Sequence, residues 1–221
     1  MTSALATFEK DHRAGFEAIV RGRRSVRSFL DEEVPRTAIE EMVRLATCAA
    51  SPRNAQMWRF IAVQDRALIA AMQAAVNERF EELAGWPALA GQRRKLAAAR
   101  AHALFFANAP VCVAVLALPF ASQMDELLDL AEVSREEHDR LRGRPDLQRV
   151  GAAVQLLTTA AHAMGYGACW MCAPVVAAER LEKLLEVAPP ARLVALVPIG
   201  RPAGAAKSAK RLPLEDVLSF R

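Results

Sequence analysis

The chain has 221 residues, of which 53% are hydrophobic and 24% charged, with a formal net charge of +4. This composition supports a sizeable core and excludes a globally disordered chain. The mild positive excess argues against a nucleic-acid binder, which concentrates basic residues on one face and interleaves them with aromatic side chains. Glu9, Lys10 and Asp11 come too early for a signal peptide.

The first part of the chain predicts two helices, a loop and a strand. A helix is expected over residues 3–21, and a second helix is expected to start with Pro35 in its first turn, a position that tolerates proline. The polar stretch 51–56 indicates a loop, and 58–63 indicates a buried strand. Asp65 suits the N-cap of a further helix that continues to residue 80.

The rest of the chain predicts a central sheet under a cover of helices. Residues 111–118 are apolar and largely β-branched, as in a central strand, and 192–199 form a second such run. An excursion at about 121–145, acidic and then basic, indicates a surface helix pair or flap. From Asp146 a helix carries a wide apolar stripe that a core or a subunit interface must cover. We therefore expect one domain over 1–221, of mixed α/β or α+β class.

Two uncharged runs, 103–121 and 151–178, are long enough to suggest a membrane span. Prolines, glycines and polar residues interrupt both runs, so we expect buried core and no membrane partner. The cysteines stand in apolar surroundings, which predicts buried, reduced thiols and a cytoplasmic protein. They are Cys48, Cys112, Cys169 and Cys172.

A basic cluster after the first helix carries the first chemical signal. Its polar members are Arg23, Arg24, Ser25 and Arg27. Forked guanidinium donors and a hydroxyl suit a dianionic phosphate. The pair Lys210–Arg211 could hold the same phosphate from a second side if the fold brings the two ends of the chain together. A solvated basic surface is the alternative, because short basic runs are weakly specific.

A polar loop, Ser51–Trp58, carries the second signal. It presents the Ser51 hydroxyl and the carboxamides of Asn54 and Gln56 just before the tryptophan at the strand start. Carboxamides both donate and accept hydrogen bonds, which suits the edge of a heterocycle. An ordinary turn between helix and strand is the alternative.

Taken in order, these motifs resemble the FMN-dependent nitroreductase superfamily. The chain carries Arg-Arg-Ser-x-Arg-x-Phe at 23–29, Ser-x-x-Asn-x-Gln-x-Trp at 51–58 and Gly-x-Gly-x-x-Trp at 165–170. A basic pair before Pro-Leu-Glu follows at 210–215. Each motif is weak alone, but together, in this order along nearly the whole chain, they make a strong joint signal.

The resemblance implies an α+β fold with a central, mostly antiparallel sheet of about five strands, flanked by helices in an intertwined homodimer. It implies an FMN-dependent oxidoreductase that passes a hydride from NADH or NADPH through flavin N5 to a small nitroaromatic or quinone acceptor, in a ping-pong cycle. The excursion would cover the active site. Reductive dehalogenation, flavin fragmentation and desaturation are alternatives in the same superfamily. A non-catalytic module that binds flavin or nucleic acid is a further alternative.

The resemblance also implies roles for the basic residues. Those that would hold the FMN phosphate or lie close to it are Arg23, Ser25, Arg211 and Lys210. Arg24 would lie at the ribityl–phosphate end of the cofactor. Arg27 would lie nearer the pyrimidine edge, where a fixed cation stabilises the anionic reduced flavin.

Two further segments would surround the ring. The partner subunit would supply the loop residues, which are Ser51, Pro52, Arg53, Asn54 and Gln56. The residues that would run along the ring near N5, with backbone N–H donors, are Met171, Cys172 and Ala173.

The sequence Cys169–Cys172 is a C-x-x-C motif. A redox dithiol belongs at a helix N-terminus, and a zinc site needs a second ligand pair. The apolar segment supplies neither, so we expect two buried or flavin-lining thiols and no metal. No side chain is expected to act as the catalyst, because flavin N5 would carry the chemistry.

Overall fold

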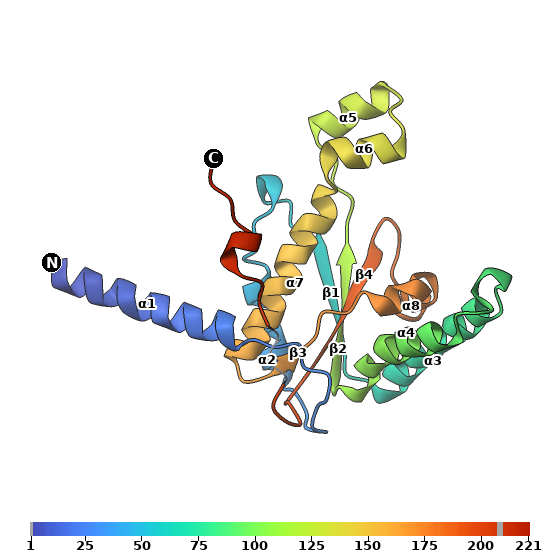
Figure 1. Ribbon diagram of the computed structural model, residues 1–221, viewed down its shortest axis with the longest axis horizontal. Coiled ribbons are helices and arrows are strands. Elements are labelled where there is room, and N and C mark those ends of the chain that lie inside the picture. The colour runs from blue at the N-terminus through green and yellow to red at the C-terminus, as the bar shows by residue number, and fades with distance from the viewer. Residues whose placement is uncertain (1, 207–209) are drawn as a thin grey trace.

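In the computed structural model, which describes residues 2–206 and 210–221, helices enclose one antiparallel sheet (Figure 1). Over this described part the sheet has four strands in the order β1-β2-β4-β3, each pair antiparallel. The strands are β1 (Trp58–Val63), β2 (Val111–Ala117), β3 (Gly167–Ala168) and β4 (Arg192–Gly200). The α+β class is confirmed. The fifth strand expected from the resemblance does not occur among the described residues.

Helices cover both faces of the sheet. The helices of the described residues are α1 (Thr2–Gly22), α2 (Arg36–Ala46), α3 (Arg66–Ala84), α4 (Arg93–Leu104), α5 (Gln123–Leu130), α6 (Arg135–Arg142), α7 (Pro145–Ala163) and α8 (Ala178–Leu184). One face packs against α2 and α7, and the other packs against α3, α4 and α8. The wide apolar stripe of α7 is therefore covered largely by the core of its own subunit.

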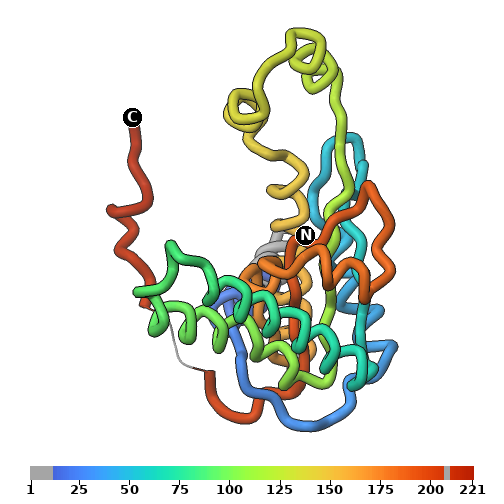
Figure 2. The backbone as a smooth tube through the Cα atoms, turned by 90° about the vertical axis from the view of Figure 1, so that its right-hand side faces the viewer, coloured from blue at the N-terminus to red at the C-terminus, as the bar shows by residue number. Residues whose placement is uncertain are grey.

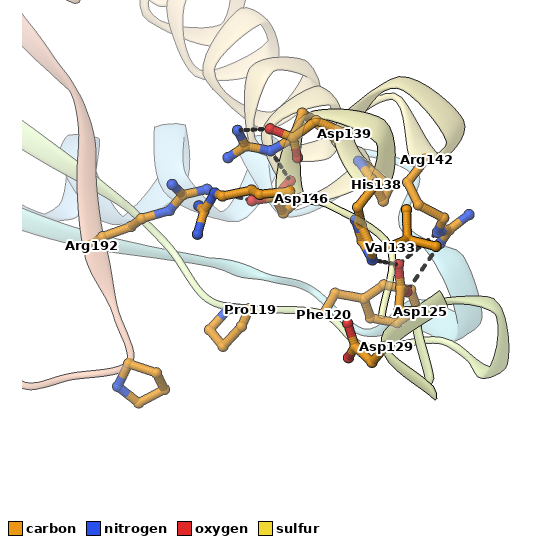
Figure 3. A pocket seen from close by; sticks show the side chains of 14 residues that line it. Pro119, Phe120, Asp125, Asp129, Val133, His138, Asp139, Arg142, Asp146 and Arg192 are labelled. Atoms are coloured by element: carbon orange, nitrogen blue, oxygen red, sulfur yellow. Dashed lines mark hydrogen bonds and ion pairs between the residues drawn. The ribbon is translucent and has the colours of Figure 1, made fainter. Parts of the chain in front are cut away.

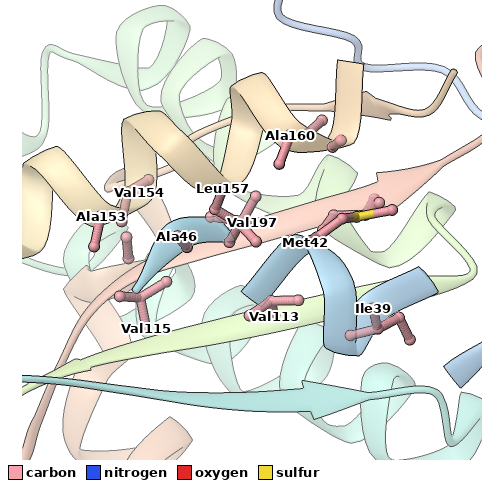
Figure 4. Packing of buried hydrophobic residues seen from close by; sticks show 14 of the residues in the cluster. Ile39, Met42, Ala46, Val113, Val115, Ala153, Val154, Leu157, Ala160 and Val197 are labelled. Atoms are coloured by element: carbon pink, nitrogen blue, oxygen red, sulfur yellow. The ribbon is translucent and has the colours of Figure 1, made fainter. Parts of the chain in front are cut away.

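Alternation along β2 explains the two-sided core. Val113 and Val115 point toward α2 and α7, whereas Cys112 and Ala114 point toward α3 and α8. Every residue of β2 is buried, as a central strand requires. Figure 4 shows Val113 and Val115 facing Leu157 of α7 across this layer. Truncation of a side chain as deeply buried as Leu157 to alanine costs about 2–5 kcal/mol.

Local signals fix several element ends. The Asp65 side chain accepts a hydrogen bond from the Ala67 N–H at 2.8 Å, which confirms the predicted N-cap of α3. Pro35 lies one position earlier than expected, at the N-cap of α2, because its ψ of 141° is not helical. The predicted flap is a helix pair, α5 and α6, that projects from the body (Figure 1).

The apolar runs that suggested a membrane are divided among short elements. The first run contains the end of α4, a short 3-10 helix (Phe105–Asn108) and β2, and the second contains most of α7 and β3. Within the part of the chain that the structure describes, no helix combines the length and hydropathy needed to cross a bilayer.

Both ends of the chain extend away from the sheet. Figure 1 shows α1 projecting to one side, and Figure 2 shows the C-terminal segment, residues 210–221, standing away from the body. Every residue of this segment is exposed. Its exposed apolar side chains are Leu212, Leu214, Val217, Leu218 and Phe220.

The four cysteines are free, as predicted, but only two are buried. Cys112 lies in β2 and Cys169 lies beside β4, both inside the core. Cys48 is exposed, contrary to the prediction, and Cys172 is exposed too, so it is not one of the two buried thiols that were one alternative for the C-x-x-C motif. Cys48 follows the last turn of α2, and Cys172 ends a segment paired with β4, so apolar neighbours in sequence do not cover either thiol.

Candidate functional site

The basic cluster lies in an extended segment that is fixed along the β3 edge of the sheet. The Val26 N–H donates to the Ala168 carbonyl at 3.0 Å, and Ser25 forms a parallel bridge with Ala168. Further along, the Leu30 N–H donates to the Arg201 carbonyl at 2.9 Å. The backbone that carries the arginines is therefore held by hydrogen bonds before and after Arg27.

Side chains alternate along this extended segment. Val26 is buried against β3, where Gly167 makes room for it: a Cβ at Gly167 would meet three Val26 carbon atoms at 2.7–2.8 Å. Ser25 and Arg27 therefore share the opposite side of the segment, and Arg23 stands just before them at the end of α1. We refer to these three residues as the clamp.

The clamp converges on the thiol of Cys169. Burial raises the pKa of this thiol, while the charges of Arg27 and Arg23 and a hydrogen bond with Ser25 act in the opposite direction. All three residues thus lie within electrostatic reach of one sulfur atom. Sequence reasoning did not include Cys169 among the cofactor-binding residues, although its place in the C-x-x-C motif pointed toward this segment.

Arg24 does not share the clamp's side of the segment. Its guanidinium donates to the Arg21 carbonyl and, at 2.9 Å, to the Arg23 carbonyl. Both carbonyls stand at the end of α1, where cationic donors stabilise the last turn. The structure therefore gives Arg24 a role in ending the helix, and its role at the ribityl end of a cofactor stays a prediction.

The polar loop holds a strained backbone. It contains a short 3-10 helix, η1 (Pro52–Asn54), and left-handed φ angles of 52° at Arg53, 54° at Asn54 and 45° at Gln56. The Ser51 hydroxyl closes the loop by accepting a hydrogen bond from the Gln56 N–H at 3.1 Å. A left-handed conformation costs about 1–2 kcal/mol per residue outside glycine, and such strain clusters at functional sites.

The residues of this loop differ in their exposure to solvent. Arg53 and Asn54 are exposed, whereas Ser51, Pro52 and Gln56 are half-buried. The loop therefore presents the Arg53 guanidinium and the Asn54 carboxamide to whatever approaches it.

The loop and the clamp lie at opposite ends of the sheet. Trp58, just after the loop, pairs with Ala117, which in turn pairs with Arg192 at the start of β4. The clamp lies beside Ala168, which pairs with Ile199 near the end of β4. The distance along β4 is about 23 Å, at roughly 3.3 Å per residue. A single chain therefore does not bring the two halves of the expected site together.

The segment expected near flavin N5 leaves the middle of β4. Met171 is buried and exchanges two backbone hydrogen bonds with Leu196, both of 2.9 Å. Its N–H is thus already donated, and it cannot serve a cofactor without breaking this pair. Cys172 and Ala173 are exposed at the start of a 3-10 helix, η4 (Ala173–Ala177), and they remain available from the expected trio.

Lys210 and Arg211 belong to the C-terminal segment. Both are exposed at its start. Figure 2 shows this segment standing away from the body of the subunit. The two-sided grip of Lys210 and Arg211 on the phosphate stays a prediction.

A cavity of about 530 Å³ lies between the excursion and the body (Figure 3). Asp125 dominates its excursion side: it pairs with Arg142 at 2.6 Å and lies 3.5 Å from His138. Hydrogen bonds from Arg142 hold the pKa of Asp125 well below its usual range, against the opposing effect of burial. Arg192 of β4 pairs with Asp146 on the body side.

This cavity lies at the Arg192 end of the sheet, far from the clamp. Leu118 donates its N–H to the Met57 carbonyl at 2.8 Å, so the excursion starts directly beside the polar loop. The cavity and the loop thus occupy the same end of the subunit.

The chain matches the model of the Nitroreductase family over residues 20–201, and it belongs to this family. Over 93% of its length it is similar to a BluB-like flavoprotein from Clostridium difficile 630, with 28% identity, a TM-score of 0.82 and 98% coverage of that structure. It shares the fold of a variant of the FMN and NADPH-dependent nitroreductase NfnB from Sphigopyxis sp. strain HMH. That likeness has 18% identity, a TM-score of 0.70 and coverage of 94% and 98% of the two chains.

A shorter stretch matches a curated enzyme. Over 43 residues the chain is 54% identical to a 4-nitrobenzoate reductase from Nocardioides sp. (strain LMS-CY). This stretch spans 20% of the chain and 17% of that relative.

Proposed function

We propose that the protein is an FMN-dependent oxidoreductase that uses NADH or NADPH to reduce a small nitroaromatic or quinone acceptor. The observation that carries the proposal is the convergence of Arg23, Ser25 and Arg27 beside a fixed backbone segment. Membership of the Nitroreductase family and the fold shared with an FMN and NADPH-dependent enzyme support it.

The donor set of the clamp suits FMN. Arg23 and Ser25 offer a forked cation and a hydroxyl for the phosphate, and Arg27 holds a positive charge for the pyrimidine edge of the ring. When bound, FMN would take a hydride at N5 from the nicotinamide and pass the electron pair to the acceptor. The exposed Cys172 and Ala173 would line the ring with backbone donors.

A homodimer would complete the site. Because loop and clamp lie at opposite ends of one sheet, a second subunit in the opposite orientation would bring its Asn54 to the clamp. Its Arg211 would reach the same phosphate, carried on the exposed C-terminal segment.

The open edge of the sheet supports an intertwined arrangement. β1 is the edge strand, and a groove of about 580 Å³ runs beside it, lined by residues of α2 and β1 such as Ile39, Val43 and Phe60. The partner's apolar C-terminal segment would fill this groove and supply the fifth strand of the expected sheet.

The excursion would then cover the partner's ring. It starts beside the polar loop, so a loop that reaches the partner's cofactor carries α5 and α6 to the same place. The cavity beneath these helices would leave room for an acceptor. The four free thiols support a reducing, cytoplasmic location.

Purification and spectroscopy test the proposal. We expect a yellow protein, or one that turns yellow on addition of FMN, and rapid bleaching on stopped-flow mixing with NADH or NADPH. A panel of nitroaromatics and quinones should restore the colour. A protein that cannot be loaded with FMN contradicts the proposal, and so does a loaded protein that neither nicotinamide reduces.

A second candidate is a specialised flavoenzyme of the same superfamily. The high TM-score and 28% identity with a BluB-like flavoprotein favour it. The distinguishing experiment follows the flavin itself: reduced, FMN-loaded protein is exposed to oxygen and its absorbance is recorded. Full return of the FMN spectrum supports the reductase, whereas loss of the chromophore supports flavin fragmentation.

A further inference from the structure

Two aromatic rings stand beside the clamp and have no role in the proposal above. The guanidinium carbon of Arg27 lies 6.0 Å from the ring centroid of Phe105, in the cation–π range. The His102 ring meets Phe105 edge-on, with centroids 6.3 Å apart and an interplanar angle of 86°. Phe105 is half-buried and His102 is exposed, so both rings border open space.

Helix α4 lies beside both ends of the surface on which the flavin ring is expected to lie. His102 lies in its last turn, and Phe105 caps its end. The same helix contacts η4, which begins at Ala173 in the segment expected near N5. Through Phe105 it also reaches Arg27, the residue expected at the pyrimidine edge. The end of α4 therefore forms a wall beside the surface on which a flavin ring would lie.

Positive charge predominates along α4, where Glu81 of α3 pairs with Arg100. No aspartate or glutamate occurs from residue 83 to residue 124, which includes all of α4. Arg27 stands beside the end of α4 next to Phe105, whereas Arg93, Arg94 and Lys95 stand in its first turn, far from His102. A wall with an aromatic face, an exposed imidazole N–H donor and an adjacent guanidinium suits a flat aromatic ring that bears an anion.

We propose that Phe105 and His102 form the acceptor-binding wall of this site and select aromatic acceptors that carry a carboxylate. Phe105 packs against the acceptor ring, and the His102 N–H donates to the carboxylate. This inference rests on the proposed function, because the wall matters only where a flavin ring lies beside it.

The test compares two acceptors that differ in charge, 4-nitrobenzoate and 4-nitrobenzamide. We expect FMN-loaded wild-type protein to favour 4-nitrobenzoate in kcat/KM by about tenfold, since a hydrogen bond to a charged group has this effect. His102→Ala should remove this preference by lowering kcat/KM for 4-nitrobenzoate to the value for 4-nitrobenzamide. His102→Gln, which restores a donor, should recover most of it. Phe105→Leu should weaken both acceptors alike.

Arg94→Ala is the matched control. It removes a cation from the same helix, but about 12 Å along the axis from His102, beyond the Debye length of about 8 Å at physiological salt. We expect less than a twofold change in the preference. Benzoate, which is not reduced, gives a binding readout: its perturbation of the flavin spectrum should weaken about tenfold in His102→Ala.

Each outcome has a distinct meaning. Equal use of the two acceptors by a wild-type protein that binds FMN and reduces both overturns the acceptor wall alone. A change in FMN affinity in His102→Ala also overturns it, because the imidazole would then serve the cofactor. A protein that binds no FMN overturns both the wall and the proposed function.

Discussion

At the residue scale, the decisive feature is the alternation of side chains along residues 23–27. An extended backbone sends Ser25 and Arg27 to one side and Val26 to the other, and Arg23 joins them from the end of α1. Arg24 turns back to the end of α1. The family resemblance implies a different role for each of the three arginines, and the structure adds that Arg24 turns away from the other two.

The first prediction concerns this separation. Arg23→Ala should weaken FMN binding about thirtyfold, since it removes a charge-assisted hydrogen bond of about 2 kcal/mol. Arg27→Ala should mainly lower the reduction potential of bound FMN, because it removes a positive charge from the ring edge. Arg24→Ala should lower the melting temperature more than the FMN affinity. Equal loss of FMN in all three variants would contradict this division.

The second prediction concerns the support beneath the clamp. Gly167→Ala places a methyl group within 2.7–2.8 Å of Val26, so the clamp segment must move away from β3. We expect a lower melting temperature and weaker FMN binding together, both measurable by fluorescence. Gly91→Ala is the control, because a Cβ there meets no atom within 4 Å. Normal FMN binding in Gly167→Ala would show that the clamp does not depend on β3.

At the element scale, the excursion is held together by one buried carboxylate. Asp125 caps α5 with Ser122 and pairs with Arg142 of α6, so it ties the two helices to each other. The pKa of Asp125 is lower in the fold than in the unfolded chain, because Arg142 stabilises its charge. Its contribution to stability is therefore present above about pH 4 and is lost as the pH falls below that value.

The third prediction follows from this tie. Asp125→Asn should destabilise the excursion by about 2 kcal/mol at pH 7 and make it a site of limited proteolysis. The wild-type protein should show the same susceptibility only as the pH falls below about 4. Asp129→Asn is the matched control, since Asp129 is exposed on the same helix. Equal resistance to protease in Asp125→Asn and Asp129→Asn would show that other contacts hold α5 and α6 together.

At the scale of the whole molecule, the fourth prediction concerns shared sites. Arg23→Ala damages the clamp, and Asn54→Gly removes a loop carboxamide at a φ that glycine tolerates. In a homodimer with shared sites, each variant alone damages both sites. Unfolding and refolding the two together should restore about a quarter of the sites, all in mixed dimers. No gain in FMN binding or activity on mixing would contradict a site built from two subunits.

Much of this architecture follows from the sequence, for identifiable reasons. The strand at 58–63, the N-cap at Asp65 and the long apolar helix before Gly165 depend on local patterns that the fold keeps. The exposure of Cys48 and Cys172 was not predictable, because it depends on which neighbours arrive from elsewhere in the chain. The contact between Arg27 and Phe105 joins distant segments and has no local pattern at all.

The placement of the loop and the clamp at opposite ends of one sheet bears on how FMN binding depends on the protein concentration. If each cofactor is held by two chains, FMN acts as a molecular tie between subunits, and association and cofactor retention are thermodynamically linked. Dilution that separates the subunits would release FMN, and removal of FMN would loosen the pair. Under this arrangement the colour of the protein would report its state of assembly as well as its redox state.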